Sequence, residues 1–354
     1  MHMADALLAP AVAAAMYVAS GTAAGISAHQ LRKEDDPKKL PTMAVTAALV
    51  FAGQMINYTI PGTGSSGHMC GGMLLSALLG PYAGFLSMIV ILAIQCLFFA
   101  DGGLMALGAN VWNMAFYGCF VGYFLIWRPI LRSRWFEGRG EKTAQFWKII
   151  IASILGCVVT LQLGAFSVVL ETSLSGITEL PFGAFVALMQ PIHLAIGLVE
   201  GIVTAAVLVF VFSSRPELLR DVTLSDEGVT NRRSLKTTLI ILAVVVALVG
   251  GGLSLFASSN PDGLEWALFG NAEEGYSENM GLDEDEFGVQ SKAADTAGSI
   301  QETTSFLPDY AFSGSDSAAG TSVSGIVGSA LVALVAVALC FVCGFFRKRR
   351  LKKE

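Results

Sequence analysis

The chain has 354 residues, of which 54% are hydrophobic and only 14% are charged, and its formal net charge is −6. A water-soluble protein of this length could not bury so much apolar surface, so the composition excludes a soluble globular protein and indicates an integral membrane protein. The acidic balance, without concentrated basic and aromatic residues, also excludes a nucleic-acid-binding protein.

Long apolar runs recur along the chain, and each is long enough to cross the hydrocarbon core of a bilayer, which takes about 20 residues. Continuous runs predict helices rather than the strands of a barrel. We therefore expect an all-α, polytopic membrane bundle, with a shorter glycine-rich element at 67–82 that spans or re-enters the membrane. The predicted long spans are 6–28, 42–60, 83–100, 104–131, 149–170, 183–212, 237–257 and 325–346.

Basic residues in short loops mark the cytoplasmic side of a membrane protein. Here they gather in 32–39, 128–148, 215–236 and 347–353. About nine crossings, with the N-terminus extracytoplasmic and the C-terminus cytoplasmic, place all four clusters on one side.

The composition also predicts two modules. We interpret the charged stretch 213–236 as a cytoplasmic linker between a bundle of residues 1–212 and a two-helix module of residues 237–354. The extracytoplasmic loop 258–322 of this module carries thirteen Asp or Glu residues and the single Lys292. It is either a solvated linker or a funnel that concentrates cations.

The first two residues form a potential metal chelate. The Met1 amine, the His2 amide and the His2 imidazole can close a five-membered and a six-membered ring around one ion, provided that Met1 is retained and its amine is free. A planar set of nitrogens suits Ni(II) or Cu(II), whereas Zn(II) prefers a tetrahedron. The alternative is an exterior terminus in which His2 has no role.

His68 is the candidate for a fourth nitrogen ligand. It follows the Gly/Ser/Pro-rich residues 60–67 at the exterior start of a membrane element, where irregular backbone lines ligand sites. An ionisable residue in such a place is expected to be functional. Residues that could orient the ligand imidazole as outer partners, or could instead only bridge helices, are Asn57, Ser66, Asn110 and Asn113.

His193 and Glu200 lie two turns apart on one predicted helix face, where we expect them to form interhelical hydrogen bonds. An alternative function uses Ser66, whose Gly64-Ser-Ser-Gly67 context matches the GxSG of rhomboid-type intramembrane serine proteases, with His193 as its base. The Met1-His2 terminus has no part in that chemistry. The sequence has no GxxxxGK[ST] loop, so ATP-driven transport would need a separate ATPase.

Several motifs in order resemble the CbiM/NikM substrate-binding membrane components of energy-coupling-factor transporters for cobalt and nickel. These motifs cover most of residues 1–212. They are the Met1-His2 start, Gly-Ser-Ser-Gly-His68, the stretch from Gln95 to Phe99 followed by Asp101-Gly-Gly-Leu-Met-Ala-Leu-Gly-Ala-Asn110-Val-Trp-Asn113-Met, and His193-Leu-Ala-Ile-Gly-Leu-Val-Glu200-Gly.

The resemblance implies that Ni(II) or Co(II) is the transported substrate, bound in a square plane by the Met1 amine, the His2 amide and imidazole, and the His68 imidazole. It also implies a prokaryotic plasma membrane, a transmembrane coupling subunit and ATP-binding subunits as partners, and no enzymatic activity in this chain. It leaves the choice between nickel and cobalt open.

The second module resembles the small two-helix partner of these systems, CbiN or NikN, through its Pro261-Asp-Gly-Leu-Glu265 run. The resemblance implies that this partner, here fused, helps to load the metal, with Asp262 and Glu265 making transient contacts. The alternative is a capped turn that only fixes the start of a helix.

Overall fold

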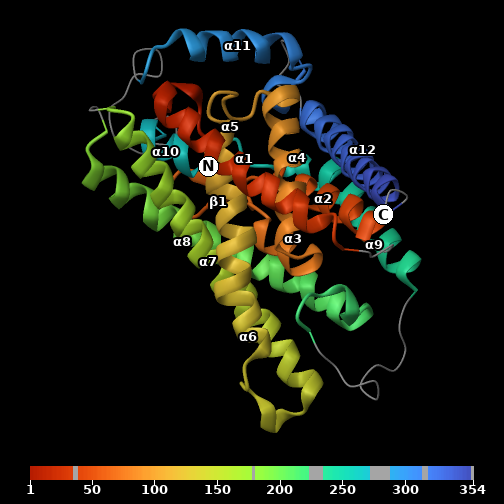
Figure 1. Ribbon diagram of the computed structural model, residues 1–354. Coiled ribbons are helices and arrows are strands. Elements are labelled where there is room, and N and C mark those ends of the chain that lie inside the picture. The colour runs from red at the N-terminus through yellow and green to blue at the C-terminus, as the bar shows by residue number, and fades with distance from the viewer. Residues whose placement is uncertain (35–38, 178–179, 223–233, 272–287, 313–317, 352–354) are drawn as a thin grey trace.

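The computed structural model describes residues 1–34, 39–177, 180–222, 234–271, 288–312 and 318–351. Within these residues the chain is a bundle of long helices with one short hairpin, which confirms the predicted all-α fold (Figure 1). Seven helices are long and apolar enough to cross a membrane. They are α1 (Pro10–Leu31), α4 (Pro81–Phe99), the continuous helix Leu107–Arg132, α7 (Glu141–Leu174), α8 (Phe182–Ser214), α9 (Leu235–Gly251) with its extension to Phe256, and α12 (Ala318–Leu351).

The glycine-rich region contains more structure than the sequence predicts. The α2 helix (Lys39–Gln54) ends before the predicted limit of residue 60. It is followed by an antiparallel hairpin of β1 (Tyr58–Ile60) and β2 (Ser65–Gly67), with Thr59 paired with Ser66. The next helix, α3 (Gly72–Leu79), is short and wholly buried. The predicted element at 67–82 is therefore the end of a hairpin followed by a buried helix.

Local sequence explains where helices begin. Pro10 and Pro81 occupy the first positions of α1 and α4, where a missing N–H is harmless and the fixed φ suits a helix. Gly80 separates α3 from α4 with a φ of 82°, which a residue with a side chain rarely adopts. The chain thus turns sharply between two packed helices.

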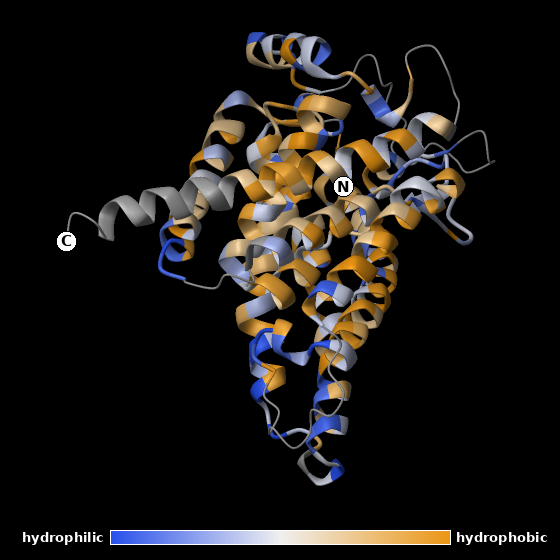
Figure 2. Cartoon of the chain, turned by 90° about the vertical axis from the view of Figure 1, so that its right-hand side faces the viewer, coloured by the Kyte–Doolittle hydropathy of each residue, from blue (hydrophilic) through white to orange (hydrophobic). Residues whose placement is uncertain are grey.

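Helix α8 shows how the bundle is divided between lipid and core. Leu194, Leu198 and Ile202 are exposed on one face, whereas His193 and Glu200 are each only 1% exposed on another. Apolar residues fill the middle of the molecule and polar residues gather in the connections at its narrow end (Figure 2). This distribution is that of a bundle surrounded by lipid.

The residues after 234 pack onto the bundle rather than apart from it. Helices α9 and α12 lie against α2, and α10 (Gly263–Phe269) lies against α8 and β2. Helix α11 (Lys292–Thr304) crosses the wide end of the molecule near α4 and the N-terminal segment (Figure 1). The part of the chain that follows α9 therefore covers the region where the N-terminus enters.

Candidate metal site

The N-terminal segment is threaded into the bundle and held at fixed points. Asn110 brackets Met3, because its Oδ1 accepts from Met3 N at 2.7 Å and its Nδ2 donates to Met3 O at 3.1 Å. Asp5 Oδ1 accepts from Ala106 N at 2.9 Å. A Cβ added at Gly103 would lie 1.8 Å from Asp5 Oδ1, so only glycine fits at position 103 without a shift of the N-terminal segment. These contacts give the first two residues one defined position.

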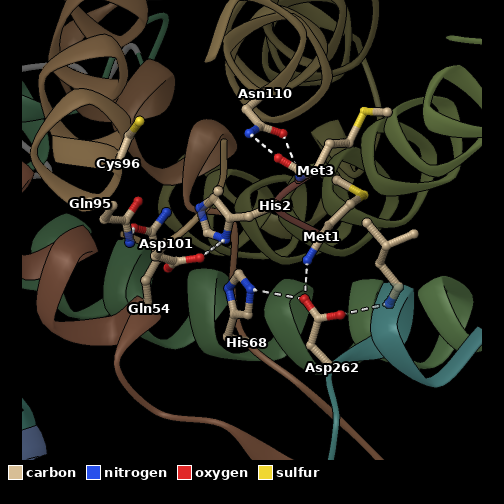
Figure 3. A network of polar contacts seen from close by, with 12 residues as sticks. Met1, His2, Met3, Gln54, His68, Gln95, Cys96, Asp101, Asn110 and Asp262 are labelled. Carbon is tan, nitrogen blue, oxygen red and sulfur yellow. Dashed lines mark hydrogen bonds and ion pairs between the residues drawn. The ribbon is translucent and has the colours of Figure 1, made fainter. Parts of the chain in front are cut away.

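The structure brings together the three residues that the sequence proposes as ligands. The His2 and His68 rings are stacked with their centroids 5.4 Å apart and an interplanar angle of 16°. The Met1 amine lies beside them and forms an ion pair with Asp262 Oδ2, and His68 Nε2 lies 3.9 Å from the same oxygen (Figure 3). Two of the three residues, Met1 and His68, thus meet at one oxygen of Asp262, while the His2 ring stacks on His68 and its Nδ1 lies 3.1 Å from Asp101 Oδ1.

Asp262 and Glu265 form a capping box at the start of α10. Asp262 Oδ1 accepts from Leu264 N at 2.7 Å and from Glu265 N at 3.0 Å, and Glu265 Oε2 accepts from Asp262 N at 3.1 Å. The cap aims the other oxygen of Asp262 at the Met1 amine. The capped turn predicted as an alternative is present, and it also places Asp262 against the proposed ligands.

The ionisation of these groups follows from burial and from each other's charge. Although burial opposes ionisation, the Met1 amine and His68 hold the pKa of Asp262 well below its usual range. Burial lowers the pKa of the Met1 amine, but the charge and hydrogen bond of Asp262 outweigh this and raise it above its usual value. Burial, and next the charge of the amine, lower the pKa of His68 to about 4. Burial likewise lowers the pKa of His2. At neutral pH the two imidazoles are therefore uncharged.

The asparagines proposed as outer partners of the ligand imidazole do not contact His68. Asn110 bonds to the backbone of Met3, whereas Asn113 Nδ2 donates to Glu171 Oε2 at 2.8 Å and lies 3.6 Å from Met3 Sδ. The His68 Nδ1 lies 3.2 Å from its neighbour's carbonyl oxygen, Met69 O. The orienting contact of His68 is thus local.

Ser66 and Asn57 contact the turn that precedes α10. Ser66 Oγ donates to Asn260 O at 2.7 Å, and Ser66 N donates to Pro261 O at 2.8 Å. Asn57 O accepts from Ser258 N at 2.8 Å. These two residues dock the turn onto the hairpin, which brings Asp262 to the site.

Two of the candidate ligands, His2 and His68, line a cavity of about 860 Å³. Its wall is notably acidic, which favours the approach of a cation. The titratable residues that line it are His2, Asp5, His68, Asp101, Asp262, Glu265, Asp309 and Tyr310.

Glu200 fixes the backbone that follows His68. Its buried carboxylate, on α8, accepts from Cys70 N at 2.8 Å and from Gly71 N at 2.9 Å. The predicted bond between two helices is thus replaced by a bond from α8 to the irregular segment that precedes α3. His193 differs from the prediction, because its Nδ1 lies 2.8 Å from Met189 O in its own helix. Ser66 and His193 form no hydrogen bond with each other in the described chain, so the geometry gives the protease alternative no support.

Replacing Glu200 by alanine is expected to destabilise the protein by about 3 kcal/mol, because two buried N–H groups lose a charged acceptor. Chemical or thermal unfolding in detergent measures the loss. Glu200→Gln keeps one acceptor oxygen and should lose less, and Glu302→Ala, on the exposed face of α11, should lose almost nothing. Equal stability of Glu200→Ala and Glu302→Ala would show that the carboxylate does not hold this turn.

Comparison with known proteins identifies both parts of the chain. Residues 2–218 match the family described as the cobalt uptake substrate-specific transmembrane region, CbiM, and residues 236–344 match the PDGLE domain. A protein of Archaeoglobus fulgidus with the provisional name fused nickel transport protein NikMN is 35% identical over 96% of this chain and 98% of its own length.

A cobalt transport protein CbiM of Sorangium cellulosum is 32% identical over 62% of this chain and 94% of its own. A crystal structure of a truncated transition metal transporter matches with 31% identity and a TM-score of 0.51, and covers 60% of this chain and 98% of the other. The chain therefore belongs to the CbiM family of cobalt uptake transmembrane proteins and carries a PDGLE domain in the same polypeptide.

Proposed function

We propose that this protein is the substrate-binding component of a metal importer and that it captures Ni(II) or Co(II) through four nitrogens. These are the Met1 amine, the His2 amide and imidazole, and the His68 imidazole. The observation that supports the proposal is that a buried amine lies beside two stacked imidazoles, all three from the proposed ligand residues. Names of relatives for both nickel and cobalt transport support this substrate class.

The electrostatics of the site suit a divalent cation. Uncharged imidazoles can donate lone pairs at neutral pH, and the nearby carboxylates of Asp101 and Asp262 offset the charge of an ion. Because the proposed ligand set consists of four nitrogens arranged in a square plane, the site should favour nickel over zinc.

The proposed orientation has the N-terminus outside and the C-terminus inside. Three connections rich in basic residues lie together at one end of the bundle, which supports it. Arg220 lies 3.6 Å from Glu34, after α1, and Arg132 lies 2.5 Å from Asp221, so the ends of α1, α6 (Arg128–Arg132) and α8 meet there. We propose that a coupling subunit and separate ATP-binding subunits act from this side.

Metal affinity should rise steeply with pH. Between about pH 7 and 8 the imidazoles are already neutral, because burial lowers the pKa of both from its usual value, but the Met1 amine and the His2 amide must each lose a proton to bind the ion. Two protons are then released per ion, so the dissociation constant should fall roughly 100-fold for each pH unit. Isothermal titration of Ni(II) into the detergent-solubilised protein at several pH values measures the slope.

Two other slopes would be informative. If the dissociation constant fell only about 10-fold for each pH unit, one proton would be released per ion, and the backbone amide would not be a ligand. An affinity independent of pH in this range would contradict the proposed site, because it requires both protons to leave.

A further inference from the structure

The proposed chelate determines which nitrogen of His2 binds the ion. The ring between the amide nitrogen and the imidazole has six members only when it closes through Cα, Cβ, Cγ and Nδ1. A neutral imidazole has one proton, so the bound ring carries it on Nε2. An imidazole ligand is usually oriented by an acceptor for that proton.

Gln95 offers this acceptor. Its side chain is buried in α4 beside the His2 ring (Figure 3). Gln95 Nε2 donates to Gln54 Oε1 at 3.0 Å, and Gln54 Nε2 donates to Cys70 O at 2.8 Å. Because the backbone carbonyl can only accept, the chain of donors fixes the direction of both amides. Oε1 of Gln95 is left as an acceptor.

Two buried polar atoms therefore await a partner at the same place. Among the described residues, neither Gln95 Oε1 nor His2 Nε2 has a hydrogen-bond partner. Buried polar atoms without partners are rare and call for an explanation. The two atoms do not bond each other in this structure, and a proton on Nε2 would supply the donor for a hydrogen bond between them.

Asp101 acts on the opposite nitrogen. Its Oδ1 lies 3.1 Å from His2 Nδ1, and its Oδ2 accepts from the Tyr310 hydroxyl at 2.5 Å. Tyr310 is itself stacked on Phe99, with ring centroids 4.9 Å apart. A nitrogen that donates its N–H to a carboxylate has no lone pair for a metal, so the Asp101 contact and Nδ1 coordination exclude each other.

We propose that Gln95 and Tyr310 are opposing positioning residues for His2, Gln95 favouring coordination through Nδ1 and Tyr310 opposing it by fixing Asp101 against that nitrogen. On binding, the single proton of the imidazole moves from Nδ1 to Nε2, and its acceptor changes from Asp101 to Gln95. This inference rests on the N-terminal chelate of the proposed function.

Two substitutions that conserve charge test it. Gln95→Met removes the acceptor and should weaken Ni(II) binding roughly 10- to 100-fold, as outer-shell changes typically do. It should also move the d–d absorption of bound Ni(II) to longer wavelength, because an imidazole without an acceptor is a weaker donor. Tyr310→Phe frees Asp101 and should strengthen binding several-fold. Titration of Ni(II) into each full-length variant gives the affinity, and thermal unfolding verifies that each variant is folded.

The opposite signs are the decisive readout, since a merely structural role would weaken binding in both variants. Weaker binding in both folded variants, or no change in Gln95→Met, would overturn the inference. A control distinguishes failure of this inference from failure of the proposed function. It is Ni(II) binding by the otherwise unmodified protein with one residue added before Met1. If the extension abolishes binding while both substitutions weaken it, the chelate stands and only the inference falls. If the extension has no effect, both fall.

Discussion

One residue added before Met1 is expected to weaken Ni(II) binding about 1000-fold or more. Four donors together typically provide about 10 to 16 kcal/mol, so each is worth roughly 100- to 1000-fold in affinity. The extension removes the amine and with it the five-membered ring that positions the amide. The amine is also fully enclosed beside Asp262, so an added residue has no room. Titration of Ni(II) and of Co(II) into the two proteins measures the effect.

The same residue added after Glu354 is the matched control and should leave affinity unchanged. If the N-terminal extension binds Ni(II) as tightly as the unmodified chain, the amine is not a ligand. The proximity of residues 1, 2 and 68 would then need another explanation, such as packing of the buried terminus.

Replacing His68 by alanine is expected to weaken binding roughly 100- to 1000-fold, the value of one donor. The remaining three nitrogens still form their two rings, so the variant should keep weak binding rather than lose it all. The Ni(II) absorption spectrum should change at the same time, because the fourth donor becomes water. Equilibrium titration and visible spectroscopy on the same samples provide both readings.

His29→Ala is the matched control, because His29 is exposed near the end of α1 and should not affect either reading. An unchanged spectrum in His68→Ala would exclude His68 from the ligand set even if the affinity fell. Such a result would assign His68 an indirect role, through its contact with Asp262.

The sequence predicts the bundle well because lipid imposes a simple rule, that a helix must be long and apolar. It predicts the region 54–80 poorly, because Gly80 and the hairpin depend on tertiary packing as well as hydropathy. Thr59 and Ser66 pair in a two-stranded hairpin that is too short to show a period. The predicted limit of residue 60 for the second span was wrong for the same reason, since the apolar run continues past the helix end.

For the site, chelate chemistry allows Met1, His2 and His68 to be proposed from sequence, and the structure places them together. The contacts around them could not be predicted. Asp262 lies 261 positions from the amine that it binds, and Tyr310 lies 209 positions from Asp101. Nothing in local pattern links such residues. Gln95 belongs to the motif shared with the CbiM/NikM proteins. From sequence alone, however, an amide in a membrane helix is expected only to form a hydrogen bond to another helix, and its neighbours must be known before another role can be assigned.

The docking of the Asn260–Asp262 turn on the hairpin has a consequence for assembly. Since Ser66 and this turn belong to one polypeptide, their encounter is intramolecular, with an effective concentration that for short linkers reaches the millimolar range. A protein with a counterpart of residues 2–218 alone would have to recruit the turn from another molecule, at a level set by the abundance of both. Covalent fusion makes occupancy of this contact independent of expression, and it fixes one turn per site.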